Sequence, residues 1–202
     1  MAHTSVKISA NSSDYQSQMK SAASQMKVLT SEFKLAQTQA KAFGSAADQL
    51  KAKAESLTQK ITLQKNIVQL NSEQQAKLTQ KLSDQKTKQE ELKTKVEAAK
   101  KAYEESTKAT GANSDQSKAL KEELNKLEQE LKANETAIGK TETALVNQTT
   151  RVNESKASLV EMESELKKTN TELKNHKLDE WHKFCDWIKR LPYSKLITGE
   201  EV

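Results

Sequence analysis

The apolar residues between positions 15 and 103 recur at alternating intervals of four and three residues. Of the 26 positions in this register 21 are apolar, whereas random placement at the chain's 34% hydrophobic content would put about nine there. A repeat of 3.5 residues keeps one stripe of a helix facing a partner along its whole length. The pattern therefore predicts one long coiled-coil helix over residues 12–109, with Asn11, Ser12, Ser13 or Asp14 as its cap.

Gly44 lies inside this register, and the phase of the repeat is the same on both sides of it. A glycine costs a helix interior about 1 kcal/mol relative to alanine. Because the phase is kept, we expect a continuous or slightly bent helix at this point, with a hinge as the alternative.

A second register of the same kind begins after a break in the chain and runs from Leu120 to His176. Within the break, Gly111 is suited to the left-handed conformation that ends a helix, and Asn113 or Ser114 is suited to cap the next one. We therefore predict a turn at residues 110–114 and a returning heptad helix over residues 115–176.

The position of the turn predicts which seam residues meet. If the chain folds back at residues 111–112, positions whose numbers add to 223 lie opposite each other, so that Gln89 meets Asn134 and Gln75 meets Gln148. Buried polar pairs fix the register of a coiled coil at some cost in stability. The predicted fold is all-α: a long coiled coil that forms an antiparallel helical hairpin, with a projecting N-terminal helix and a short C-terminal amphipathic helix.

The two ends of the chain depart from the heptad pattern. Residues 1–11 are predicted to form an arm with a short alternating stretch at Val6 to Ile8, and residues 177–202 an aromatic amphipathic tail that Pro192 interrupts. Half of the chain's eight aromatic residues fall in the last 27 positions, and the seam phase changes just before them. A packing cap on the coiled coil and a membrane-surface helix are alternatives for this tail. Our hypothesis is a protein-contact patch of Trp181, Phe184, Trp187 and Ile188, used either for self-association or for a protein partner.

Composition and charge narrow the class of protein. A chain that is 34% hydrophobic and 30% charged cannot build a thick globular core, and 4 Gly with 1 Pro argue against a turn-rich β fold. The net charge of +5 comes from interleaved charges of both signs, so no nucleic-acid partner is expected. No window approaches the roughly 20 apolar residues of a membrane span. The N-terminal residues lack the apolar stretch of a signal peptide, so secretion by that route is not expected.

Side chains suited to catalysis or metal binding are few. His176, His182 and Cys185 lie near one another in sequence without a fourth histidine or cysteine ligand, and structural zinc normally has four protein ligands. There is no glycine-rich phosphate loop, and two paired helices offer no enclosed pocket for chemistry. We expect no catalytic, cofactor-binding or metal residues, and the chain is not expected to be an enzyme.

Several segments carry a resemblance to a known family. They are Asn11 to Lys20 (NSSDYQSQMK), Val28 to Lys34 (VLTSEFK) and Leu57 to Leu70 (LTQKITLQKNIVQL), preceded by the β-like stretch and followed by Lys- and Leu-rich heptads. In this order, over roughly residues 5–175, the chain resembles the N-terminal region of tail tape measure proteins from phages and prophages of Gram-positive hosts.

The resemblance implies a structural role: a helical scaffold that sets tail length or organises assembly of the tail tube. It implies a homo-oligomer, tail tube, baseplate or tail-assembly chaperone proteins as partners, and a location in the virion tail or in the host bacterial cytoplasm during assembly. The seam expected to be shared between chains consists of Tyr15, Met19, Met26, Leu29, Phe33 and Phe43. The alternative is a coiled-coil adaptor whose aromatic C-terminal helix docks a protein partner, with a regulatory, prophage-encoded protein as one form of this hypothesis.

Overall fold

Helices make up nearly all of the described structure. The computed structural model describes residues 12–190, of which 97% are helical, and this range contains no strand. The helices are α1 (Ser12–Phe43), α2 (Ala46–Thr110) and α3 (Asp115–Arg190). The predicted all-α, hairpin-like fold is confirmed. The predicted arm at residues 1–11 and the part of the predicted tail from 191 to 202 lie outside the described residues.

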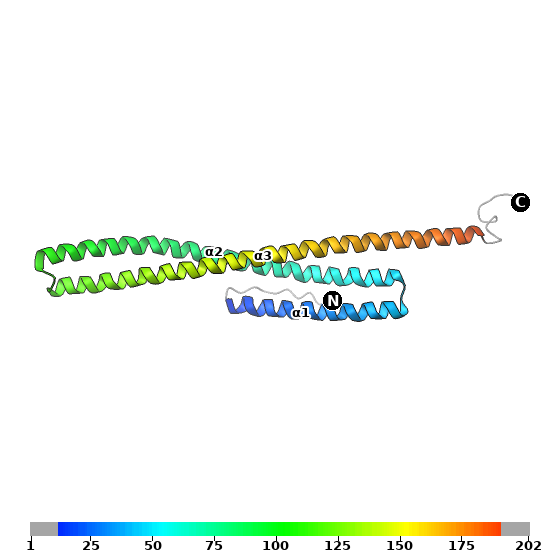
Figure 1. Cartoon of the computed structure of the whole chain (residues 1–202), viewed down its shortest axis with the longest axis horizontal. Coiled ribbons are helices and arrows are strands. Elements are labelled where there is room, and N and C mark those ends of the chain that lie inside the picture. Colours follow the sequence, from blue (N-terminus) through cyan, green and yellow to red (C-terminus); the bar gives the residue numbers. More distant parts are fainter. Residues whose placement is uncertain (1–11, 191–202) are drawn as a thin grey trace. The chain divides into compact units, whose positions relative to one another are not determined.

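The chain divides into two compact units. The first, which we call the hairpin unit, spans residues 71–153. The second contains the described residues 12–70 and 154–190, and we call it the three-helix unit. In the hairpin unit the end of α2 and the start of α3 run side by side in opposite directions, joined by a short turn (Figure 1).

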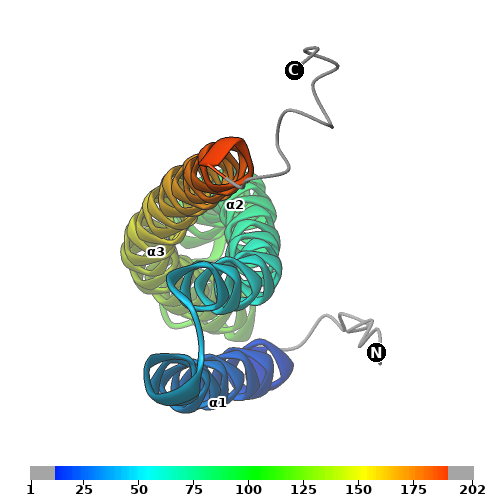
Figure 2. The same ribbon diagram turned by 90° about the vertical axis from the view of Figure 1, so that its right-hand side faces the viewer.

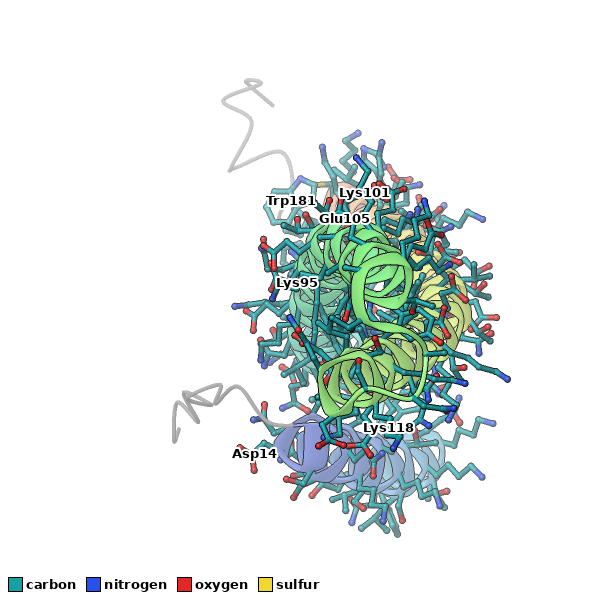
Figure 3. The ribbon with its side chains drawn as sticks, turned by 90° about the vertical axis from the view of Figure 1, so that its left-hand side faces the viewer. Asp14, Lys95, Lys101, Glu105, Lys118 and Trp181 are labelled. Atoms are coloured by element: carbon teal, nitrogen blue, oxygen red, sulfur yellow. The ribbon has the colours of Figure 1, made fainter. Side chains whose placement is uncertain are left out.

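Hydroxyl groups hold the turn of the hairpin unit together. Gly111 takes a φ of 85°, as expected for a glycine that ends a helix. Ser114 Oγ accepts a hydrogen bond from the Ser117 amide at 3.1 Å, which caps the first turn of α3. The fully buried Ser117 hydroxyl also lies 2.9 Å from the Ser106 hydroxyl on α2. Around this turn the charged side chains Lys101 and Lys118 point away from the ribbon (Figure 3).

The predicted seam is the buried stripe of α3, since every register position from Leu120 to His176 is buried or half-buried. The predicted meeting of Gln89 with Asn134 is confirmed by a 2.8 Å hydrogen bond from Asn134 Nδ2 to Gln89 Oε1. The second predicted amide layer is arranged differently. Gln75 Nε2 donates to Thr149 Oγ1 at 2.8 Å, and Gln148 Nε2 donates to the Asn71 carbonyl at 2.9 Å. The two glutamine side chains therefore do not bond to each other. Gln75 bonds to the residue after Gln148, and Gln148 bonds to a seam residue four positions before Gln75.

In the three-helix unit, α1 lies alongside the first part of α2 (Figure 1, Figure 2). Leu63 and Leu70 lie outside the α2 stripe that faces α3, yet they are only 8% and 7% exposed. A second face of α2 is therefore covered, and α1 covers it. Contact between the two helices includes the Lys60 ammonium, which lies 5.5 Å from the centre of the Phe33 ring.

The prediction of one continuous helix over residues 12–109 is wrong, because α1 ends at Phe43 and α2 begins at Ala46. Two local features account for the break. A Cβ atom on Gly44 would lie 2.9 Å from the Ala40 carbonyl oxygen, so the turn needs a glycine there. Ser45 and Asp48 then form a capping box: the Ser45 amide donates to Asp48 Oδ2 at 2.8 Å, and the Asp48 amide donates to Ser45 Oγ at 3.2 Å. The N-terminal helix thus turns back along α2 instead of projecting from it.

The C-terminal segment also differs from its prediction as a separate helix. α3 continues without interruption from Asp115 to Arg190, so residues 177–190 are its last turns. The sequence holds no glycine or proline between Gly139 and Pro192. The change of seam phase near residue 177 therefore alters which face of α3 is apolar and leaves the backbone helical.

Candidate protein-docking surface

The last turns of α3 extend beyond the helix that covers the rest of it. Lys53 Nζ of α2 lies 2.9 Å from Glu165 Oε1 of α3. α2 begins at Ala46, seven residues before Lys53. Because α3 runs antiparallel to α2, the start of α2 lies near the residue seven positions after Glu165, which is Glu172. His176 is the last seam position that is half-buried. Residues 177–190, which we call the overhang, therefore have no part of α2 opposite them.

The overhang carries a row of exposed aromatic side chains. Trp181, Phe184 and Trp187 are 60%, 47% and 56% exposed. Their rings follow one another at 5.9 Å and 6.0 Å between centroids, because a spacing of three residues puts them on neighbouring turns of one helix face. We call these three residues the aromatic row. The structure thus brings together the aromatic residues of the contact patch hypothesised from the sequence, with Ile188 half-buried beside them.

Charged groups of both signs flank the aromatic row, and three of them, Glu180, Asp186 and Lys189, are paired within α3. Glu180 Oε1 lies 3.5 Å from His176 Nδ1, and Asp186 Oδ1 lies 3.7 Å from Lys189 Nζ. Arg190 has no ion-pair partner within residues 12–190. The Asp186–Lys189 pair is solvent-exposed and contributes little to stability. The main consequence of these charges is a surface in which both signs of charge surround an apolar centre.

An open groove continues this surface along the three-helix unit. It lies between α2 and α3, with Ile61 and Leu166 as apolar lining and the Lys65–Glu163 ion pair, 3.2 Å long, beside it. Leu178 lines one end of the groove and is also 46% exposed, three residues before Trp181. The contact hypothesis omitted Leu178, although its spacing of three from Trp181 is the signal that would have included it.

The other predicted contact surface, the N-terminal seam, is largely covered within a single chain. Tyr15, Met19, Met26, Leu29 and Phe33 are each half-buried in the structure, whereas Phe43 is 94% exposed at the end of α1. Because α1 turns back along α2, the first five lie on a helix that already has an intramolecular neighbour. Their assignment as a seam shared between chains stays a prediction, and the fold leaves Phe43 as the member most accessible to a partner.

The described residues include no group of three or more His, Cys, Asp and Glu side chains that could hold a metal ion. Cys185 is a free, half-buried thiol. Across residues 12–190, no helix has an apolar stretch long enough to cross a membrane. In comparisons with known proteins, no protein-family model, curated protein or solved structure matches this chain.

Proposed function

We propose that this chain is a non-catalytic helical scaffold and that it works as a tape-measure-like component of a phage tail. The observation that carries the scaffold role is the long seam between α2 and α3, in which every register position of α3 from Leu120 to His176 is at least half-buried. Such a seam holds two helices in register within each unit, which is a mechanical property. The phage setting comes from the sequence resemblance described above.

In this role the chain sets tail length or organises assembly of the tail tube, in the virion tail or in the bacterial cytoplasm during assembly. Its proposed partners are further copies of itself and tail tube, baseplate or chaperone proteins. The long polar faces of α2 and α3 suit such a role because interleaved charges keep a helix surface solvated. Binding to partners then depends on the few apolar side chains that remain exposed.

The experiment that tests the tape-measure role changes helix length without changing register. The variant lacks residues 75–95 of α2 and the opposite residues 128–148 of α3. Each deletion removes three whole heptads from its helix, so the phase of the seam is kept. At 1.5 Å per residue each helix shortens by about 32 Å. Electron microscopy of tails made with this variant should show a uniform shortening of up to that amount. Val146→Ser, an exposed substitution that changes no length, is the control, and tails of unchanged length in the deletion variant would contradict the role.

The aromatic row favours a second candidate function, a coiled-coil adaptor that docks another protein through the end of α3. Exposed tryptophan is unusual on a solvated helix and is enriched where binding energy concentrates. Under this proposal Trp187→Ala leaves the melting curve nearly unchanged and abolishes a complex with a tail tube, baseplate or chaperone protein. Val160→Ala, which truncates another exposed apolar residue of α3, should leave the complex intact. A complex that survives Trp187→Ala would retire the adaptor role for this surface.

A further inference from the structure

We infer that α2 and α3 also pair between two copies of this chain, in a dimer in which each hairpin has opened and the copies exchange α3. In that dimer α2, the turn and α3 of one copy form a single straight helix, and two such helices lie antiparallel. Further copies of the chain are among the partners proposed above, so the dimer rests on the proposed function in that respect. Three features carry it: the phase of the repeat across the turn, the structure of the turn, and the charges beside the seam.

One heptad phase runs through the turn. Continued from Tyr103 in steps of three and four residues, the α2 register reaches Leu120, where the α3 register begins. The positions between them are all uncharged: Ser106, Thr110, Asn113 and Ser117. A hairpin does not require this agreement, because its two helices can present their stripes in unrelated phases. A single straight helix does require it, since only an unbroken phase keeps the whole stripe facing one partner.

The pairing inside the hairpin unit is also the pairing that such a dimer needs. Positions whose numbers add to 223 meet across its seam, as Gln89 does with Asn134 and Ser106 with Ser117. Two straight helices that are antiparallel about a two-fold axis at residues 111–112 bring the same positions together, one from each copy. The dimer therefore keeps the contacts between α2 and α3, and only the turn changes.

The turn has little that opposes a straight conformation. Gly111 is the only residue among 12–190 with a positive φ, and its neighbours Ala112 and Asn113 are exposed. A Cβ atom on Gly111 would meet nothing within 4 Å, so nothing packs against this point. Pairs of hydroxyl groups join the two helices beside it, Ser106 with Ser117 at 2.9 Å and Thr110 with Ser114 at 2.8 Å. A straight segment here loses no apolar contact and gains helical hydrogen bonds.

The charges beside the seam select the antiparallel orientation. On α2 the flanking positions between 81 and 100 are all lysine: Lys81, Lys86, Lys88, Lys93, Lys95 and Lys100. On α3 five of the six flanking positions between 123 and 142 are glutamate: Glu123, Glu128, Glu130, Glu135 and Glu142.

An antiparallel pair sets these lysines against these glutamates, as the hairpin unit shows with Lys86–Glu142 at 3.3 Å and Lys100–Glu128 at 3.5 Å. In a parallel pair, flanking positions five residues apart meet across the seam. Lys81 would then meet Lys86 of the second copy, and Glu123 would meet its Glu128. Like charges along the whole contact disfavour that orientation, so the second copy runs antiparallel.

Protein concentration decides between the two forms. Monomer and dimer share the seam contacts, so the balance lies between the turn and the freedom that two chains lose when they associate. We expect the hairpin in dilute solution and the exchanged dimer in concentrated solution. Because α3 has to leave its own α2 before it can pair with another, the concentration during refolding sets the ratio.

Refolding over about a hundredfold range of protein concentration, followed by size-exclusion chromatography with light scattering, tests the dimer. The wild-type chain should shift from monomer to dimer across this range. Gly111→Ala should raise the association constant roughly a hundredfold, because alanine suits a helix better than glycine and suits a left-handed φ worse, in both copies. Gly139→Ala is the matched control: Gly139 lies within α3, and an added Cβ atom meets nothing within 4 Å.

A second variant tests the phase without altering any existing side chain. Two glycines inserted between Ala112 and Asn113 lengthen the turn of a hairpin but shift the phase of a straight helix by about 200°. This variant should refold to monomer even at the highest concentration. A wild-type chain that is monomeric throughout, a Gly111→Ala variant that dimerises no more than Gly139→Ala, or an insertion variant that dimerises like the wild type would each overturn the inference.

Cysteine cross-linking tests the exchange and the orientation. In a Cys185→Ser background, chains with Val96→Cys and chains with Leu127→Cys are refolded together at high concentration. The antiparallel dimer should give disulfides between position 96 of one chain and position 127 of another. Disulfides between two Val96→Cys chains would show a parallel pair and overturn the arrangement. These measurements use the purified chain alone, so their failure is distinct from a failure of the tail-length experiment.

Discussion

The two units of this chain share α2 and α3 but have different interiors. In the hairpin unit the buried polar residues outnumber the buried apolar ones: Asn71, Gln89, Ser106, Ser117, Asn134, Thr141 and Gln148 against Leu92, Val96, Ala99 and Val152. In the three-helix unit the balance reverses, with Ala22, Leu57, Ile61, Leu63 and Leu70 against Gln64, Ser155 and Thr169. The number of helices that meet accounts for this difference.

Two helices share only one narrow stripe, so a polar side chain there can hydrogen-bond across the seam, as Asn134 does with Gln89 at 2.8 Å. When α1 covers a second face of α2, more side chains lose water on both sides, and apolar residues such as Leu63 and Leu70 occupy those positions. Apolar burial contributes about 25 cal/mol per Å² to stability, whereas buried polar pairs mainly specify the register. The comparison therefore assigns stability chiefly to the three-helix unit and register chiefly to the hairpin unit.

The largest expected effect tests where stability resides. Ile61 is 7% exposed in the three-helix unit, and Ile61→Ala should lower the free energy of unfolding by about 2–4 kcal/mol through lost burial and a residual cavity. Urea titration followed by circular dichroism measures the change. Val146→Ala in the hairpin unit, at a position 66% exposed, is the control and should change stability by no more than about 0.5 kcal/mol. Equal effects of the two substitutions would show that burial of Ile61 adds no stability to the three-helix unit.

The next effect tests the polar seam of the hairpin unit. Asn134→Ala leaves the Gln89 side chain without its cross-seam donor and should cost about 1–3 kcal/mol. Replacing Gln89 and Asn134 together by Leu should be nearly neutral or stabilising, because no buried polar group is then left unpaired. Chemical denaturation of Gln89→Leu, Asn134→Leu and the double variant gives the coupling between the two residues. Additive losses would show that the pair contributes no shared hydrogen bond.

The same double variant should loosen register even where it gains stability. Cysteines at positions 96 and 127, in a Cys185→Ser background, lie opposite each other in the predicted pairing and should cross-link within one chain. Adding the two leucines should broaden the set of cysteine positions that cross-link. If the variant with the two cysteines and without the two leucines cross-links only between chains and only at like positions, the result would indicate a continuous parallel coil and would refute the hairpin.

The 3.5-residue repeat predicted the seam well because the seam residues of both α2 and α3 follow that repeat. Every register position from Tyr15 to Tyr103 is buried or half-buried except Phe43. A continuous helix was preferred over a hinge at Gly44 because the heptad phase is equal on both sides of it. The available signal was local: Ser45 and Asp48 have the spacing of a capping box immediately after a glycine.

The contact between α1 and α2 was harder to predict from the pattern. The second stripe on α2 contains Ser56, Lys60, Leu63, Ile67 and Leu70, at the same 3.5-residue spacing as the first. Only three of these five residues are apolar, so the stripe is weak when read alone. The contact patch on the overhang was found because aromatic residues are scarce in this chain, while Leu178 was missed because leucine is common in it.

A smaller effect compares the two turns, one at each junction between helices. Ser45 caps α2 in the three-helix unit, and Ser114 caps α3 in the hairpin unit. Alanine at either position should destabilise the first turn of its own helix by about 1 kcal/mol. Amide hydrogen exchange should detect faster opening near Asp48 in Ser45→Ala and near Ser117 in Ser114→Ala. Ser83→Ala, in the exposed middle of α2, is the control and should slow exchange slightly or leave it unchanged.

The smallest effect separates the two turns by pH. Hydrogen bonds from the Ser45 amide and then from its hydroxyl hold the pKa of the Asp48 carboxyl below its ordinary value. A carboxyl whose pKa is lowered by folding stabilises the folded state at neutral pH, and this contribution is lost as the pH falls through the folded pKa. The cap of α3 relies on serine hydroxyls, which do not titrate in this range. Acidification should therefore loosen the start of α2 before it affects the start of α3.

Carbon-13 NMR of the Asp48 carboxyl during an acid titration measures this pKa directly. In Ser45→Ala the pKa should rise only part of the way to the ordinary value, because the backbone amide of residue 45 is the larger cause and remains in place. In Asp48→Asn the opening of the first turn of α2 should lose its dependence on pH, since an amide cannot ionise. An Asp48 pKa that is unchanged by Ser45→Ala would show that the serine hydroxyl contributes nothing, and the capping box would then act through the backbone alone.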